Sequence, residues 1–443
     1  MLRLIRRISK WVLEERRRIG RLSREGGWLI IGQVIGVLGQ LMLIRVMTEY
    51  LAPAEYGTLA LALTIGVLVC QVSFANSMPG IMRYYTLAVE CGDVLAFARA
   101  AQRSMGLSAI IAIALTCFIL LGAMISQYSA WLPFIVAASL ISILGSFNST
   151  LSGIQNAARQ RAVVAAHGAI DPWLRIILAA SAVKYLGPTV FAALVGYSIA
   201  AALVMCSQWI FFLRLLTVQS QNVPNAITSW DQKIWTFSKP YVFFNLPTWA
   251  QTNSDRWSLQ TYANSVSVGQ FSALMQLGYA PIFMIVGFVN TLIGPILYSR
   301  SGDATDELRN AGVHRISWVL VAICLLLTGL GVWITWVFNA RIFALLVGAE
   351  FQSVSYLLPW TVLAGGMLAA GQILNVKMAS ELRTQALLWP KMVISVAGVG
   401  VNFIGAYYGG IDGVVIAANV SSFVALIWFA FLAMSTERAV ISI

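Results

Sequence analysis

The sequence predicts an all-α, polytopic membrane protein with twelve transmembrane helices arranged as two six-helix bundles. Of its 443 residues, 59% are apolar and only 10% are charged, whereas about a quarter of the residues in a soluble protein are charged. Long, nearly uncharged runs recur along the whole chain, and each can cross a hydrocarbon core of about 30 Å. Strand-like alternation of apolar and polar residues is absent, which argues against a membrane barrel.

The apolar runs define twelve spans. The first six lie near 27–48, 56–78, 105–126, 131–155, 162–185 and 188–213. The second six lie near 237–262, 267–298, 315–339, 353–376, 385–408 and 411–434. The eighth is too long for one straight helix, and its Gly287, Gly294 and Pro295 predict that it bends or ends early.

The spans form two sets, residues 27–214 and 237–434, joined by a cytoplasmic connection over 215–236. A faint repeat relates them, because "YGTLALAL" opens the second span and "VGQFSALMQL" opens the eighth. Further on, "GPTVFAALVGYSIAAAL" from Gly187 aligns without a gap with "GIDGVVIAANVSSFVAL" from Gly410. An even number of spans per set predicts parallel repeats related by a pseudo-two-fold axis along the membrane normal. Transporters with such repeats bind substrate between their halves.

The basic residues predict the orientation. With a cytoplasmic N-terminus, the tails and inside loops hold 23 of the 29 Lys and Arg, while the outside loops hold two. Basic residues next to spans gather on the cytoplasmic side, so both termini are expected there. Segment 1–26 is basic and amphipathic and is expected to lie on anionic headgroups, and 435–443 forms a cytoplasmic tail. The net charge of +12 therefore reflects topology and does not indicate nucleic-acid binding.

Nothing in the sequence indicates a metal site, a disulfide or a cofactor. The cysteines lie in spans or an inside loop, without metal-binding spacing and without two in one outside loop; they are Cys70, Cys91, Cys117, Cys206 and Cys324. No phosphate-binding glycine loop occurs, so the chain is not expected to consume ATP.

The fifth span carries three ionisable residues on one stripe. His167, Asp171 and Arg175 are spaced i, i+4, i+8, which places them on one helix face. Asp171 precedes Arg175 in the order that favours a helical ion pair. Pro172 frees a backbone carbonyl at this depth, which only buried or wet surroundings tolerate. The stripe either lines a cavity or is a self-neutralised pair that fixes packing. His167 extends it beyond one pair and favours the cavity.

The seventh span contains adjacent charges in "QTNSDRWSLQTY". Asp255 shares a face with Gln251, whereas Arg256 is turned about 100° away, and adjacent residues do not face each other on a helix. We therefore do not expect a simple salt bridge between them. Either one charged flank borders a polar cavity, or both charges pair with neighbouring helices.

Polar residues also mark the eleventh and first spans. Lys391, Ser395 and Asn402 share one stripe of the eleventh. Lys391 lies near its cytoplasmic end, where it either faces the cavity or snorkels to the interface. Arg45 lies near the outer end of the first span, with Glu49 four residues on, and the same two interpretations hold.

The charges within the spans predict an anionic substrate. Four cations (Arg45, Arg175, Arg256 and Lys391) stand against two carboxylates, leaving a surplus of two positive charges that nothing in the sequence neutralises. Intramembrane charges usually mark substrate or ion pathways, and arginine binds phosphate or pyrophosphate with its planar fork. Asp171, Asp255 and His167 are candidates for coupling to H⁺ or Na⁺, since binding of the ion there would change substrate affinity and reset the carrier.

Two stretches carry a resemblance to a known family. An Arg followed by "EYG" near the end of the first span, and "DRWSLQTYANSVSVGQFSALMQL" across the seventh and eighth, resemble the bacterial polysaccharide flippases of the Wzx type. Asp255, Arg256 and Gly269 match best. At Arg45 the chain departs from the family, because "VMTEYLAPA" lengthens the interval. These flippases share a superfamily with the multidrug and toxic-compound extrusion (MATE) transporters.

The resemblance implies two bundles in a V around a cationic cavity in the bacterial inner membrane. It implies movement of undecaprenyl-pyrophosphate-linked oligosaccharide from the cytoplasmic to the outer leaflet, for O-antigen, capsule or exopolysaccharide synthesis. Membrane lipids, a polysaccharide polymerase and chain-length machinery are the implied partners. The expected binding residues are Arg45, Arg175, Arg256, Lys391, Gln251, Ser395 and Asn402.

Two other functions are considered. A cation-coupled multidrug antiporter of the same superfamily relies on acids within the bundle, and the first span has none before Glu49. A membrane glycan polymerase or ligase usually needs an extended outer loop, whereas the longest one here, near 340–352, is short. The sequence also lacks a nucleophile with a base, so a transporter is favoured over an enzyme.

Overall fold

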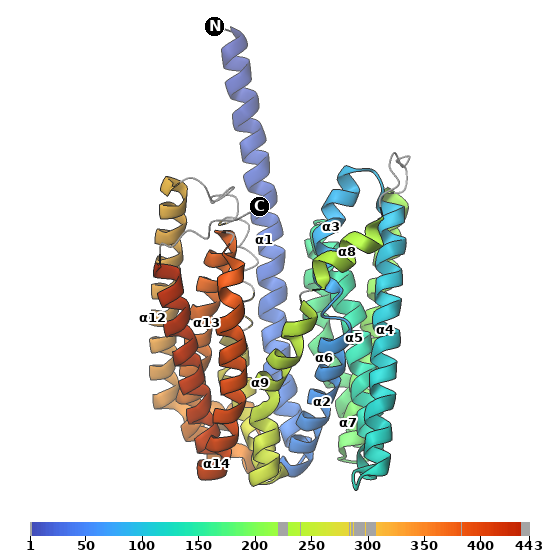
Figure 1. Cartoon of the computed structure of the whole chain (residues 1–443), viewed down its shortest axis with the longest axis vertical. Coiled ribbons are helices and arrows are strands. Elements are labelled where there is room, and N and C mark those ends of the chain that lie inside the picture. The colour runs from blue at the N-terminus through green and yellow to red at the C-terminus, as the bar shows by residue number, and fades with distance from the viewer. Residues whose placement is uncertain are drawn as a thin grey trace.

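The structure, a computed structural model, is built from helices throughout the part of the chain that it describes. That part comprises residues 2–219, 229–239, 241–282, 284, 287, 297, 307–381 and 383–435, and no strand occurs in it. The helices stand side by side as two groups, with α1 between them (Figure 1). The all-α prediction is confirmed.

The helices occur in the predicted order along the chain. The N-terminal half consists of α1 (Leu2–Tyr50), α2 (Pro53–Ser73), α3 (Met78–Glu90), α4 (Val94–Ile125), η1 (Ser129–Trp131), α5 (Leu132–Ala157), α6 (Arg161–Leu186) and α7 (Val190–Gln219). The short α8 (Trp230–Ser238) lies between the halves in sequence. The C-terminal half consists of α9 (Tyr241–Tyr262), α10 (Ser265–Gly278), α12 (Glu307–Leu346), η2 (Ala349–Leu357), α13 (Leu358–Ser380), η3 (Thr384–Leu387) and α14 (Leu388–Met434).

Twelve membrane crossings are confirmed. Within the described residues, nine helices are long and apolar enough to cross a membrane by themselves. One of these, α14, contains a non-helical residue at Gly410 and so forms two crossings, as predicted. The polar α9 and the eighth span, which begins with α10, supply the remaining two.

The internal repeat has a structural counterpart. Gly187 and Gly410, which the sequence aligns, both have positive φ angles, 99° and 53°, a backbone region that favours glycine. Each begins the return to the last helix of its half. In addition, α1 packs along α6, and α9 packs along α14, so the first and fifth crossings pair in both halves. Two related six-helix bundles result.

The N-terminal segment continues without a break into the first crossing. Residues 2–50 form one continuous helix that projects beyond the bundles along the long axis of the molecule (Figure 1). The expected position of this segment on anionic headgroups stays a prediction. Proline is absent from this stretch, so nothing interrupts its backbone hydrogen bonds.

The eighth span is interrupted before the glycine at 287, and residues 280–282, 284, 287 and 297 are helical beyond the break. Its helix α10 stops at Gly278, and Tyr279 caps it. Gly294 and Pro295 lie outside the described residues.

The connection between the halves contains a helix that the sequence analysis did not predict. Trp230 at the start of α8 is only 2% exposed, and its Nε1 donates a hydrogen bond of 2.8 Å to Asp93. Lys233 lies 4.9 Å from the Trp230 ring centroid, and Arg103 pairs with Asp231 at 3.3 Å. The contacts of Trp230 with Asp93 and of Asp231 with Arg103 attach α8 to the N-terminal bundle, so the chain leaves that bundle just before α9.

Close packing of α6 and α7 gives a first prediction. A Cβ added to Gly196 would lie 2.4 Å from the Ala179 Cα, whereas one added to Gly106 would meet nothing within 4 Å. Gly196→Ala should therefore lower the free energy of unfolding by about 1–3 kcal/mol through overpacking. Gly106→Ala, the matched control, should leave it unchanged or raise it by up to about 1 kcal/mol. Thermal unfolding in detergent measures both. Equal melting temperatures would contradict this packing.

Candidate functional site

The two bundles touch through a reciprocal contact at the side remote from the chain termini, hereafter the closed side. A Cβ on Gly57 of α2 would lie 2.0 Å from the Ser265 carbonyl oxygen, and a Cβ on Gly269 of α10 would lie 2.0 Å from that of Pro53. Each glycine thus meets the backbone four residues before the other. Gly57 and Gly269 are also equivalent in the sequence repeat, so the contact obeys the pseudo-two-fold relation. Only glycine permits this approach.

Further contacts hold the closed side together. The Gly348 backbone N–H donates to Thr48 Oγ1 at 2.9 Å. The rings of Tyr56 and Phe351 meet edge to face at a centroid distance of 5.6 Å. Phe351 belongs to η2 and is fully buried. The corner between α12 and α13 therefore packs on α1 and α2 of the other bundle.

Arg45 belongs to this closed side. Its guanidinium donates to the Val347 carbonyl oxygen and pairs with Glu49 at 3.0 Å. The residue predicted either to bind substrate or to snorkel is thus engaged between the bundles. A role in substrate binding stays a prediction.

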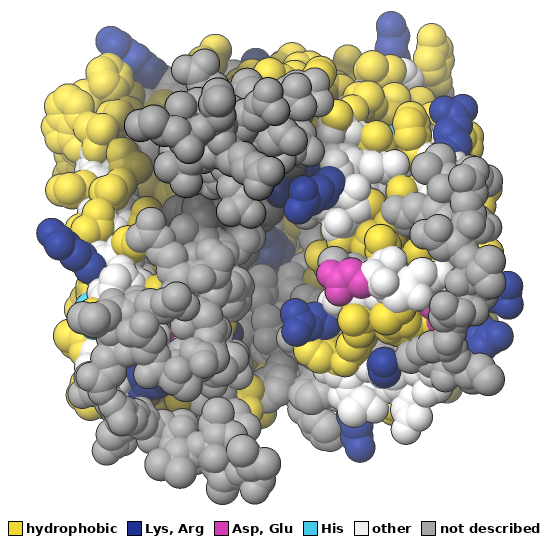
Figure 2. Space-filling model, turned by 90° about the horizontal axis from the view of Figure 1, so that it is seen from above, with side chains coloured by type: hydrophobic (Ala, Val, Ile, Leu, Met, Phe, Trp, Pro, Cys, Tyr) yellow, Lys and Arg dark blue, Asp and Glu magenta, His cyan; other side chains and the backbone are white. Residues whose placement is uncertain are grey.

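The opposite face, which carries both termini, is hollowed between the bundles (Figure 2). Lys and Arg side chains are spread over this face, and Asp and Glu side chains are fewer (Figure 2). The helices α3 and α8 lie at this end of the N-terminal bundle (Figure 1). The bundles thus touch at one side, and the face at the other side is recessed.

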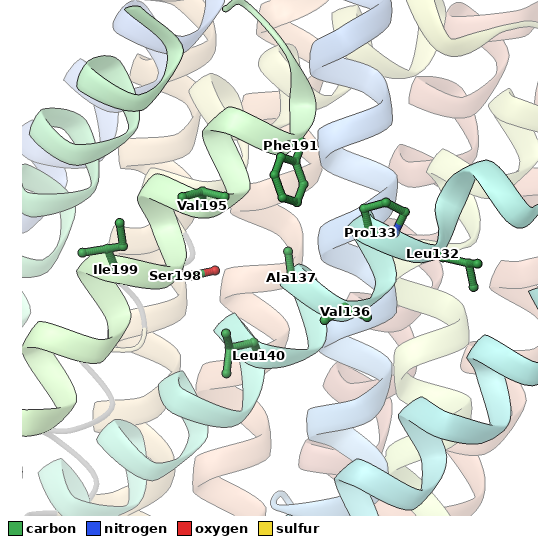
Figure 3. A pocket seen from close by; sticks show the side chains of 9 residues that line it. All are labelled: Leu132, Pro133, Val136, Ala137, Leu140, Phe191, Val195, Ser198 and Ile199. Carbon is green, nitrogen blue, oxygen red and sulfur yellow. The ribbon is translucent and has the colours of Figure 1, made fainter. Parts of the chain in front are cut away.

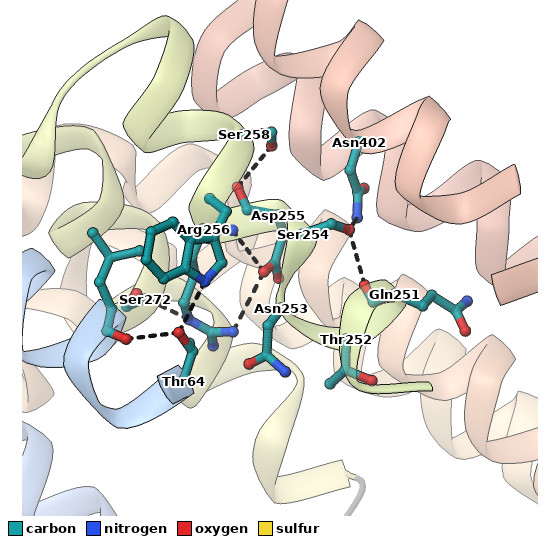
Figure 4. Close-up of polar contacts among 12 residues, drawn as sticks. Thr64, Gln251, Thr252, Asn253, Ser254, Asp255, Arg256, Ser258, Ser272 and Asn402 are labelled. Carbon is teal, nitrogen blue, oxygen red and sulfur yellow. Dashed lines mark hydrogen bonds and ion pairs between the residues drawn. The ribbon is translucent and has the colours of Figure 1, made fainter. Parts of the chain in front are cut away.

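Asp255 and Arg256 pair directly, which corrects the expectation that they would not. Arg256 Nη1 lies 3.4 Å from Asp255 Oδ1, and the same oxygen accepts the Arg256 backbone N–H at 2.7 Å. The Asp255 carboxylate lies against the backbone N–H of Arg256, and the long Arg256 side chain reaches the same oxygen. Arg256 Nε also donates to Ser272 of α10 at 3.3 Å. Figure 4 shows Arg256 between these partners.

The other polar residues of α9 join it to both bundles. Ser395 donates to Gln251 at 2.9 Å, and Asn402 donates to Ser254 at 2.8 Å (Figure 4). The polar stripe of the eleventh span therefore packs against α9. On its other side, α9 docks on α2, where Trp257 Nε1 donates to Thr64 Oγ1 at 2.9 Å. Binding roles for Gln251, Ser395 and Asn402 stay predictions.

Arg175 forms the predicted ion pair on α6. Its Nε lies 3.1 Å from Asp171 Oδ2, and its guanidinium carbon lies 5.9 Å from the ring centroid of Tyr197 on α7. The Arg175 and Asp171 side chains are 28% and 25% exposed, so both remain partly accessible. The pair is consistent with both interpretations of this stripe.

His167 is 9% exposed and lies between α6 and α7. Its Nδ1 contacts the Val163 carbonyl oxygen at 2.8 Å, and its Nε2 contacts Ser207 Oγ at 2.9 Å. Phe211 meets its ring edge to face at 5.5 Å. Both ring nitrogens are engaged within the bundle. Ion coupling at His167, as at Asp171 and Asp255, stays a prediction.

The predicted surplus of two positive charges is too large. Glu49, just past the first predicted span, neutralises Arg45, and α1 continues to Tyr50. All three intramembrane arginines thus have a carboxylate partner. Lys391 is exposed, and no carboxylate in the described part of the chain pairs with it, which leaves a surplus of one.

A hydrogen-bonded group that the sequence analysis missed joins the bundles near the closed side. Gln276 of α10 donates to the Tyr56 hydroxyl at 2.8 Å, and Gln40 of α1 donates to Gln276 at 3.5 Å. Gln276 follows Ser272, the partner of Arg256, by four residues and shares its face. That spacing was readable from the sequence, but the partners across the bundle interface were not.

An apolar groove lies apart from these residues, between α5 and α7 (Figure 3). Its volume is about 440 Å³. It is lined by Leu132, Pro133, Val136, Ala137, Leu140, Phe191, Val195, Ser198 and Ile199. A lining with one hydroxyl and no charge suits hydrocarbon.

Comparison with solved structures places this arrangement in a known fold. The chain is similar to an inward-facing MATE multidrug transporter of the MOP superfamily, with 16% identity and a TM-score of 0.60, over 90% of this chain and 94% of the other. An outward-facing MATE multidrug transporter gives 16% identity and a TM-score of 0.54, over 92% and 95%. A MOP-superfamily transporter from Pyrococcus furiosus, described as having a binding pocket of reverse polarity, gives 16% and 0.55, over 92% and 95%.

The chain therefore has the fold of the MOP-superfamily transporters. No protein-family model matches it, and no curated protein matches it.

The closed side yields a second prediction. Gly269→Val adds atoms where the Pro53 carbonyl lies 2.0 Å from a Cβ, so α2 and α10 should separate. Spin labels in place of Lys184, in the last turn of α6, and Arg341, near the end of α12, should then report a longer distance between the bundles by double electron–electron resonance in a cysteine-free background. Gly122→Val, where a Cβ meets nothing within 4 Å, is the control. An unchanged distance distribution in both variants would refute the role of this contact.

Proposed function

We propose that the protein is a transporter that works by alternating access between its two bundles. The reciprocal contact of Gly57 with Gly269 closes one side, while the opposite face is hollowed (Figure 2). The TM-score is higher with the inward-facing than with the outward-facing MATE transporter, which supports an inward-facing conformation for this protein. The basic residues of the tails and loops support a cytoplasmic position for the hollowed face.

We further propose that the substrate is a lipid-linked oligosaccharide carried on undecaprenyl pyrophosphate. Support comes from the flippase-like motifs around Arg45 and Asp255–Arg256, and from the partly accessible guanidinium groups of Arg175 and Arg256. Arginine suits a planar, bidentate grip on phosphate. The pyrophosphate and first sugars would enter from the cytoplasmic side while the polyprenyl chain stays in lipid. The protein would then act in the bacterial inner membrane, beside the polysaccharide polymerase.

A second candidate is the cation-coupled multidrug antiporter, which the solved relatives favour. Two of those compared above are multidrug transporters. The pairing of each intramembrane arginine with a carboxylate also weakens the argument from positive charge. Conversely, the Pyrococcus furiosus transporter is described as having reverse pocket polarity and a different function, so the fold is compatible with more than one kind of substrate. The similarity of the fold to that of transporters argues against the third candidate, a glycan polymerase or ligase.

Arg175 gives a third prediction. Arg175→Gln should abolish flipping of the lipid-linked oligosaccharide in proteoliposomes, because it removes the phosphate-binding fork. Arg175→Lys keeps the charge and should retain part of the rate. Arg341→Gln, on the exposed closed-side corner, is the control and should flip normally.

Equal activity in the Gln and Lys variants would show that Arg175 does not bind the phosphate. Wild-type proteoliposomes that extrude a cationic dye against a proton or sodium gradient, and do not flip the glycolipid, would establish the antiporter instead.

A further inference from the structure

The carboxylate partners of the intramembrane arginines share one arrangement. Asp255 is the residue before Arg256, and Asp171 lies four residues before Arg175, so each pair belongs to a single helix. The same holds for Arg45 and Glu49 at the closed side. None of these three pairs bridges two helices.

An ion pair within one helix adds little to the packing of helices against each other. Other groups make those contacts here. Arg256 reaches α10 through the Ser272 hydroxyl, and Arg175 reaches α7 through the Tyr197 ring. In the described part of the chain, the ion pair of each of these two aspartates is with an arginine of its own helix.

A partner on the same helix also moves with its arginine. When the bundles rock, contacts across their interface break, but the backbone that joins Asp255 to Arg256 keeps the two charges together in every state. The same is true along one turn of α6. A guanidinium left alone in the membrane is unfavourable, and an alternating-access carrier must return with an empty site after releasing its substrate.

We propose that Asp255 and Asp171 are resident counterions that neutralise Arg256 and Arg175 during the empty return and give way to the phosphate groups of the substrate. This inference rests on the proposed transport of a pyrophosphate-linked lipid. Each aspartate competes with the substrate for its arginine, so the empty site is neutral and can reorient. The same competition lowers the affinity for the anionic substrate.

The test separates the empty return from the loaded return. Purified protein in proteoliposomes is given polyprenyl-pyrophosphate-linked N-acetylglucosamine with a fluorescent sugar, and dithionite bleaching reports its leaflet. Net flipping starts with the lipid on one side only, so the carrier returns empty. Exchange is measured with unlabelled lipid in both leaflets, so the carrier returns loaded.

Asp255→Asn and Asp171→Asn should slow net flipping by about tenfold, because the lone arginine hinders the empty return. Exchange should keep most of its rate, and the KM for the lipid should fall because the competing carboxylate is gone. The double variant Asp255→Asn, Arg256→Gln removes the lone charge. It should recover net flipping relative to exchange, with a higher KM.

Asp412→Asn, the same chemical change at an exposed residue that accepts from Tyr356, is the control and should alter neither rate. A proportional fall of net flipping and exchange in the aspartate variants would overturn the counterion role. An unchanged ratio of net flipping to exchange, in variants whose melting temperature shows that they are folded, would also overturn the counterion role. If wild-type protein supports neither rate, the proposed function itself fails.

Discussion

The arrangement of the bundles depends on one backbone contact, the reciprocal packing of Gly57 and Gly269. Each glycine lacks the Cβ that would collide with the other helix, and the two positions are equivalent in the internal repeat. Because α2 and α10 meet here, the corner formed by η2 can pack on α1 and α2 through Gly348 and Phe351. The closed side thus combines close backbone packing with hydrogen bonds, an aromatic contact and the Arg45–Glu49 pair.

The charges within the membrane follow a second constraint. Three arginines each have a carboxylate on their own helix, which limits the penalty of placing charge at this depth. These arginines still have other partners. Arg45 reaches Val347, Arg256 reaches Ser272 and Arg175 lies near Tyr197. This near neutrality fits the proposed transport cycle, in which the substrate site must be both occupied and emptied.

Hydropathy predicted the twelve crossings, because helix length is a local property. Gly187 and Gly410, which the sequence aligns, both have positive φ angles in the structure. The sequence did not predict α8 or the direct pairing of Asp255 with Arg256. Burial of Trp230 against Asp93 depends on a partner distant in the chain. The pairing depends on a side-chain rotation that helix periodicity ignores. The Asp171–Arg175 pair, spaced i, i+4, was predictable. Contacts such as Gln276 with Tyr56 required the relative placement of the bundles.

The most direct test of the account is the fate of lipid-linked oligosaccharide in cells depleted of this protein. Lipid extraction, with a membrane-impermeant probe for the leaflet, measures both the amount and the side. If the protein flips this lipid, complete oligosaccharide units should accumulate facing the cytoplasm. Normal amounts on the normal side, together with lost tolerance to cationic drugs, would contradict it.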